Sequence, residues 1–166
     1  MPVRPVVSLP DPVLTAPARP VGAIDAAARA LAVDLVDTMR VSPGCVGLAA
    51  PQIGVGLRAF CVDVTGHRKA RSCHGEFVIF DPELVVAEDP EMAREGCMSV
   101  PDLTGDVRRA TRVVVTGLDP GGERVTYEAD AFEARAILHE LDHLDGMVFL
   151  DRVDGPHAVF PRKVYR

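Results

Sequence analysis

Residues 130–146 read DAFEARAILHELDHLDG and predict an amphipathic helix. Asp130 stands at the N-cap position with Glu133 three residues later, which predicts a capping box, and Gly146 is placed to end the helix in a left-handed turn. One face of this helix carries four residues spaced three or four apart: Phe132, Ala136, His139 and His143. Residues at that spacing lie one above the other, so both imidazoles point the same way.

The two histidines and the residue after the first form the pattern HExxH. On a helix, this pattern presents two ring nitrogens at a separation that suits two positions of a tetrahedral metal ion. It also places Glu140 beside the open position of the metal, where a carboxylate can act as a general base. In the alternative interpretation His139 and His143 are structural histidines and Glu140 is a solvated helix charge. A third ligand is needed to decide.

Candidate third ligands lie on both sides of the helix. The zinc peptidase pattern HExxHxxGxxH is met by Gly146 but fails at Phe149, which cannot bind a metal. Other downstream donors remain near the C-terminus: Asp145, Asp151, Asp154 and His157. Upstream, Cys97 lies in EGCMSVP (95–101), a turn-prone segment between predicted strands, where a thiolate can face a cleft. Most free cysteines are small buried apolar residues, so Cys97 gains weight only in combination with HExxH.

The remaining sequence predicts one more helix and several strands. Apolar residues recur at helical spacing from Ile24 to Met39. Four segments rich in Val, Phe and Tyr predict strands: Gly56–Val64, Glu76–Glu88, Thr111–Asp119 and Glu123–Ala129. The polar segment 66–75, GHRKARSCHG, predicts a solvated loop, although its His67, Cys73 and His74 could imitate a metal site. This mixture predicts an α+β fold.

Composition limits the class of protein. The 166 residues, 48% apolar and 25% charged, predict a single domain over 1–166. The formal net charge of -6 argues against direct nucleic-acid binding, and the sequence shows neither a signal peptide nor a membrane-spanning apolar run. We therefore expect a cytoplasmic protein. There, the four cysteines are thiols or metal ligands rather than disulfides: Cys45, Cys61, Cys73 and Cys97.

Three short motifs together resemble a known family. GLAAPQIG (47–54), EGCMS (95–99) and HELDHLDG (139–146), in this order and spacing, closely resemble the three signature motifs of the peptide deformylase family. That family removes the formyl group from N-formylmethionine on new bacterial proteins, and the similarity extends from about Val6 to Arg152. The resemblance implies antiparallel β-sheets packed around a central helix that carries HExxH.

The resemblance also implies the metal site and the catalytic groups. Cys97, His139 and His143 would bind one divalent metal ion, with Fe²⁺ expected first and Zn²⁺, Ni²⁺ or Co²⁺ able to replace it. Glu140 would act as general base and then as general acid. The developing oxyanion would be stabilised by the side-chain amide of Gln52 and by the backbone N–H of Met98.

The substrates implied are N-formylmethionyl peptides and nascent chains. Their backbone would run past Gly47, and an apolar pocket for the methionine side chain would be lined by Val46, Phe132 and Ala136. On pattern alone, Val46 and Phe132 are equally compatible with an ordinary core. Glu95 is expected to pair with an arginine, with Arg109 a candidate, and so to hold the cysteine loop.

Three features depart from the pattern of the family. Cys45 replaces a usual glycine and could narrow the substrate channel, and Leu138 replaces a usual glutamine before the first histidine, which puts metal retention and rate in doubt. From about residue 151 the chain predicts a short non-helical tail, too short for the long C-terminal helix with which some members meet the ribosome. Its basic end PRKVYR (161–166) could touch RNA but is more consistent with an extended or frayed terminus, so weak ribosome proximity stays open.

Three other functions compete with a deformylase. A paralogue could hydrolyse another N-acylated peptide or small molecule. A non-catalytic protein could hold a closed structural zinc, which requires a fourth protein ligand. An HExxH peptidase would need a downstream ligand in place of Cys97.

Overall fold

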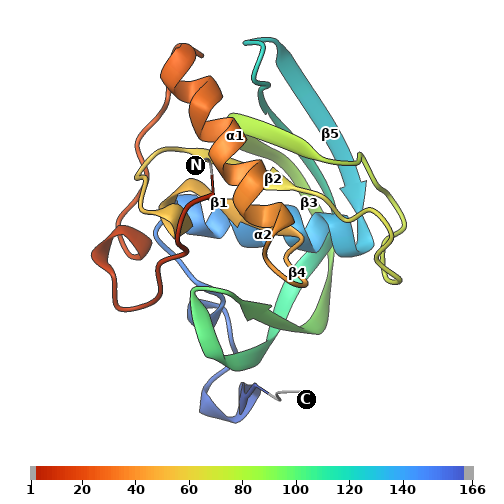
Figure 1. Cartoon of the computed structure of the whole chain (residues 1–166). Helices are drawn as coiled ribbons and strands as arrows, with labels where there is room; N and C mark the ends of the chain where they lie inside the picture. The colour runs from red at the N-terminus through yellow and green to blue at the C-terminus, as the bar shows by residue number, and fades with distance from the viewer. Residues whose placement is uncertain (1–2, 163–166) are drawn as a thin grey trace.

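The helix predicted at 130–146 forms α2, Ala131–Leu144, which crosses the middle of the molecule (Figure 1). The computed structural model describes residues 3–162. Five antiparallel strands neighbour one another in chain order: β1 (Gly47–Ala49), β2 (Ala59–Val62), β3 (Phe77–Cys97), β4 (Val100–Leu118) and β5 (Arg124–Asp130). A sixth short strand, β6 (Val159–Pro161), pairs with β4. The predicted α+β class is confirmed.

The first three strands lie between two helices. The other helix is α1, Ala26–Arg40, close to the predicted span. Phe60 and Ile79 pack with the apolar residues of α2, whereas Ala59 and Phe80 pack with those of α1. Alternate residues of a strand point to opposite faces, so both faces of β2 are covered and all four of its residues are buried. The sheet therefore holds α2 from one side and α1 from the other.

Strands β3 and β4 continue as a two-stranded ribbon far beyond the predicted bounds. The sequence predicts that the first of them ends at Glu88, but β3 runs on to Cys97 and turns into β4 through only Met98 and Ser99. The sequence does not indicate this extension of β3, because residues 83–92 are largely exposed and include Pro90, which is rare inside strands. Among the described residues, β4 is the only strand that pairs with β3 beyond Phe80, and proline is tolerated at such a free edge.

The N-terminus of α2 differs from the prediction in its capping. Asp130 is the N-cap residue, but its side chain makes no cap hydrogen bond and instead accepts one from the backbone N–H of Ser72, at 2.9 Å. Glu133 is fully buried and bonds Ser72 and His74, so the predicted capping box is wrong. Both carboxylates therefore bind the loop 66–75 and do not cap the helix. At the other end, Gly146 adopts φ +76° as expected.

The C-terminal segment is more ordered than the tail predicted from about residue 151. Single 3₁₀ turns at Phe149–Asp151 and Pro156–Ala158 lead into β6, and no α-helix occurs between there and Arg162. In the basic end 161–166, predicted to be extended or frayed, Pro161 belongs to β6, and residues 163–166 lie outside the described residues. Two further 3₁₀ turns are Pro12–Leu14 and Ala50–Ile53. Across the described residues, no helix has the length and apolarity needed to cross a membrane.

Candidate active site

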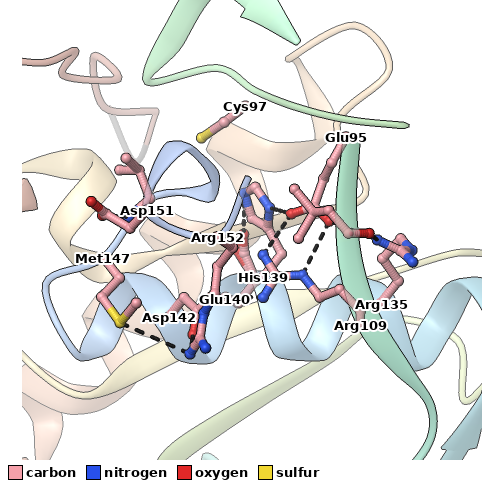
Figure 2. A network of polar contacts seen from close by, with 12 residues as sticks. Glu95, Cys97, Arg109, Arg135, His139, Glu140, Asp142, Met147, Asp151 and Arg152 are labelled. Atoms are coloured by element: carbon pink, nitrogen blue, oxygen red, sulfur yellow. Dashed lines mark hydrogen bonds and ion pairs between the residues drawn. The ribbon is translucent and has the colours of Figure 1, made fainter. Parts of the chain in front are cut away.

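Cys97, His139 and His143 converge as the sequence predicts. Their donor atoms all lie within 4.8 Å of one another, and the Cys97 Sγ is 3.3 Å from the His143 Nε2. A register shift in the β3–β4 pairing falls between Gly96 and Cys97. Such bulges re-aim side chains, and here the thiol comes to lie over the histidine face of α2 (Figure 2).

The two imidazoles are prepared for metal binding in different ways. His139 Nδ1 is hydrogen-bonded to the Glu95 carboxylate, which leaves its Nε2 for the cluster. Burial, with the nearby charges of His139 and Arg109, lowers the pKa of His143 to about 3. His143 is therefore neutral near pH 7, which is the form that coordinates metals. One cysteine sulfur and two imidazole nitrogens form a donor set that fits zinc, ferrous iron and similar divalent ions.

Glu95 is the centre of a buried ion network around this cluster (Figure 2). Its two oxygens accept from Arg109 Nη2 at 2.7 Å and Nε at 3.1 Å, and from Arg135 Nη1 at 3.1 Å. The expected pairing of Glu95 with Arg109 is confirmed. Burial alone would raise the pKa of Glu95, but the hydrogen bonds from His139 and Arg109 outweigh burial and hold this pKa far below 4.5. Glu95 is thus charged near neutral pH, and its carboxylate orients His139.

Glu95→Gln is expected to weaken metal affinity by about 10- to 100-fold, because such partners of metal-bound histidines contribute that much. Affinity would be measured by competition with a chromogenic chelator. Glu91→Gln is the matched control, since Glu91 lies on the same strand but is exposed. Equal affinities for the two variants would contradict the assigned role of Glu95.

Glu140 lies beside the cluster and is only 2% exposed. Its Oε1 is 3.9 Å from His139 Nε2, while its Oε2 is buried without a hydrogen-bond partner among the described residues. Burial raises the pKa of Glu140 to about 7. A carboxylate with a free oxygen and a pKa near neutrality suits proton transfer in both directions.

Gly47 provides the space in which this carboxylate sits. A Cβ at Gly47 would stand 3.1 Å from the Glu140 Cγ and 3.2 Å from its Cδ. The sequence predicts a glycine beside the substrate backbone. Gly47 lines the pocket, and the absence of a side chain there also leaves room for Glu140.

Gln52 reaches the cluster from the 3₁₀ turn that follows β1. The Ala49 N–H donates to its Oε1 at 3.0 Å, which fixes the amide orientation and points the Nε2 donor at Cys97 Sγ (3.5 Å) and Ser99 Oγ (3.2 Å). Ser99 is fully buried. The sequence does not indicate its contact with Gln52, although Ser99 stands inside the EGCMS motif.

A cavity of about 300 Å³ opens onto these groups. It is lined by every residue of the predicted site except the fully buried His143: Val46, Gly47, Gln52, Cys97, Met98, Phe132, Ala136, His139 and Glu140. Glu95 and three arginines that the sequence analysis missed also line it: Arg94, Arg135 and Arg162. Arg162 directly follows β6 in the chain, and only the tertiary fold shows that it lies at the cavity.

The two single-residue departures from the family pattern, Cys45 and Leu138, lie in different places. Cys45 lines the cavity, its Sγ is 3.1 Å from the Gly47 carbonyl oxygen, and burial with the charge of Glu140 raises its pKa to about 12. It is therefore a protonated thiol that narrows the cavity. Leu138 packs against the core between α2 and the sheet and does not line the cavity.

The competing ligands are used elsewhere. Asp145 pairs with Arg58 at 3.0 Å, and Asp151 accepts from the Val148 N–H at 2.9 Å. In the loop 66–75, His67 stacks on Phe132 and His74 bonds Glu133. Within residues 3–162, Cys97, His139 and His143 are the cluster suited to a metal, and it includes neither a fourth protein ligand nor a downstream one.

Sequence and structure comparisons agree with this geometry. The family model described as polypeptide deformylase matches residues 3–158. The peptide deformylase of Desulforudis audaxviator is 47% identical over 164 residues (98% of this chain, 99% of the relative), and that of Acidothermus cellulolyticus is 46% identical over 154 residues (93% and 81%).

Solved structures give the same result. The crystal structure of peptide deformylase from Ehrlichia chaffeensis superposes with a TM-score of 0.86 at 31% identity, covering 92% of this chain and 88% of that one. A peptide deformylase from Legionella pneumophila gives a TM-score of 0.84 at 37% identity, with coverages of 93% and 88%. The chain therefore belongs to the peptide deformylase family, and it is a metal-dependent enzyme that removes N-formyl groups.

Proposed function

We propose that this enzyme deformylates N-formylmethionyl peptides with Glu140 as the proton-transfer group. The observation that carries this role is the buried, unpartnered Oε2 of Glu140 beside three converging metal donors. Glu140 takes a proton from the attacking water and later delivers it to the departing amine, so that formate and a free N-terminus result. Its pKa of about 7 balances the two transfers, although a bound cation would favour the charged carboxylate and lower that value.

The metal held by Cys97, His139 and His143 would acidify the water and polarise the formyl oxygen. We propose Fe²⁺ as the native ion, with Zn²⁺, Ni²⁺ or Co²⁺ able to occupy the same donors. The single thiolate cancels only one of the two positive charges of a divalent ion, which suits a Lewis acid better than a closed structural site. Metal analysis of protein purified without oxygen identifies the ion.

The developing oxyanion meets two donors from the chain itself. The Gln52 amide is one, because its Oε1 is already occupied by the Ala49 N–H and its Nε2 must point inward. The second is the backbone N–H of Met98, which lines the cavity directly after Cys97. A backbone donor does not depend on the side chain, so methionine at this position is compatible with activity.

Gln52→Leu is expected to lower kcat by about 10²- to 10³-fold, as the loss of one oxyanion donor does elsewhere. The rate of formate release from a formyl-methionyl peptide measures this effect. Ser99→Ala is the matched control, because it removes the other partner of Gln52 Nε2 and leaves the amide in place. A kcat of Gln52→Leu within a few-fold of that control would refute the oxyanion role.

The substrate pocket follows from the same cavity. We propose that the methionine side chain lies against Val46, Phe132 and Ala136, and that the peptide backbone passes Gly47. Nascent chains in the cytoplasm are the expected source, with the chain acting as one catalytic domain over 1–166.

The substrate assignment has a direct test. Iron-loaded enzyme, kept anaerobic, is compared on formyl-methionyl, acetyl-methionyl and formyl-alanyl peptides, with formate or acetate measured. We expect formate release to be fastest from the formyl-methionyl peptide. Faster release from a different acyl group would assign the chain to the paralogue class, and no formate from any formyl peptide would overturn the proposal.

A further inference from the structure

A second groove, of about 590 Å³, adjoins the active-site cavity and shares Arg94, Phe132 and Arg135 with it. Its lining holds six cationic side chains: Arg68, Lys69, Arg71, Arg94, Arg112 and Arg135. Only two acidic residues line it, Glu91 and Asp130. We call this surface the basic groove. It is unusual in a chain whose formal net charge is -6.

Three of the six cations are already neutralised by neighbours. Ion pairs join Arg94 to Asp106 (2.8 Å), Arg112 to Glu88 (2.7 Å) and Arg135 to Glu95 (3.1 Å). The other three come from the loop 66–75, and all are exposed: Arg68, Lys69 and Arg71. Within residues 3–162, no carboxylate forms an ion pair with these three. The loop therefore supplies the cations of the groove that have no ion-pair partner among the described residues.

The loop is fixed to the catalytic helix rather than loosely solvated. Buried Glu133 accepts from the Ser72 hydroxyl and the His74 N–H, both at 2.8 Å, and Asp130 and Ser72 exchange two backbone-to-side-chain hydrogen bonds of 2.9 Å. His67 also stacks on Phe132, with ring centroids 3.8 Å apart and an interplanar angle of 3°. Phe132 is a wall of the cavity, so the cations stand at a fixed place beside the substrate site.

We propose that the basic groove binds acidic side chains of the polypeptide substrate, in residues that follow the formylated methionine. This inference rests on the proposed function. The active-site cavity and the basic groove share Phe132 and Arg135, so the residues that follow the methionine lie within reach of the basic groove. Arginine side chains recognise carboxylates with paired N–H donors. An acidic peptide is favoured over RNA because the acidic chain as a whole repels a polyanion, whereas single carboxylates meet only local charge.

The test compares formyl-methionyl hexapeptides that carry Glu, Gln or Lys at the third to fifth positions. We expect kcat/KM to fall in the order Glu, Gln, Lys, by about threefold to tenfold from first to last at low salt, as a few exposed ion pairs allow. The difference should reside in KM, because the contact is the same in ground and transition states. It should shrink towards parity in about 1 M salt, where the screening length is about 3 Å.

The double variant Arg68→Ser/Arg71→Ser should lose the preference while its kcat on the Gln peptide stays unchanged. Arg29→Ser/Arg124→Ser removes the same charge from exposed positions outside the groove and should keep the preference. Equal KM values for the Glu and Lys peptides would overturn the inference. It would also be overturned if the Arg68→Ser/Arg71→Ser variant lost binding to a short RNA but kept the wild-type preference among the peptides. Either result leaves the proposed function intact, because that function fails only if the Gln peptide releases no formate.

Discussion

Glu140→Gln is expected to reduce kcat for formate release by about 10²- to 10⁴-fold, the range that a positioned general acid–base contributes. The substitution keeps the size of the side chain but removes the proton acceptor whose Oε2 is buried without a partner in the described structure. Because Glu140 is not one of the three clustered donors, metal content should stay near one ion per chain. Steady-state kinetics and elemental analysis of the same preparation provide both readouts.

Glu128→Gln is a suitable control for this experiment, because Glu128 is exposed on β5 and does not line the cavity. Its kcat should match that of the wild type. A Glu140→Gln enzyme that keeps full activity would refute the proton-transfer role. Loss of the metal together with activity would instead indicate that Glu140 is needed to hold the ion.

Arg109→Met should destabilise the fold by about 3–5 kcal/mol, because it leaves buried carboxylates without their counter-charge. Arg109 is 5% exposed and bonds Glu95 on β3 and Asp142 on α2, the latter at 2.6 Å. Urea unfolding at equal metal loading measures the change in the free energy of unfolding.

Arg112→Met is the matched control, since Arg112 lies on the same strand and pairs with Glu88 at 2.7 Å where both side chains are about half exposed. Exposed pairs contribute about 0–1 kcal/mol. The loss in Arg109→Met should also depend on pH. The pKa of Glu95 is held below its ordinary value of 4.5, so the stability that Arg109 provides is complete above that pH and fades as pH falls below it. Equal losses in the two variants would contradict a buried network.

The sequence predicts the chemistry of this protein better than its shape. The metal ligands, Glu140 and Gln52 belong to short motifs, and the spacing of four between His139 and His143 is set by helix geometry alone. Each of these groups lies at or beside the cluster.

What the sequence does not reveal depends on contacts between distant segments. The ribbon of β3 and β4 has too many exposed residues to show the alternating pattern of a strand. These residues form strands because β3 and β4 pair with each other, and that pairing cannot be read from either segment alone. Glu133 has the spacing of a capping box, yet its carboxylate accepts hydrogen bonds from the loop 66–75 and none from the backbone N–H of the N-cap residue. The sequence also does not show where Leu138 packs. It packs against the core between α2 and the sheet, and this contact depends on how the sheet is placed around the helix.

The two-residue turn at Met98 and Ser99 ties β3 closely to β4, so insertions and deletions in either strand affect the position of Cys97. Glu95 and Cys97 stand two residues apart, both are buried, and both side chains contact a histidine of α2. Losing or gaining one residue in β3 would exchange the two faces and turn both side chains away from the helix. Length changes in the ribbon are therefore expected to come in matched pairs on β3 and β4, before the bulge at Gly96, so that the cysteine keeps its face.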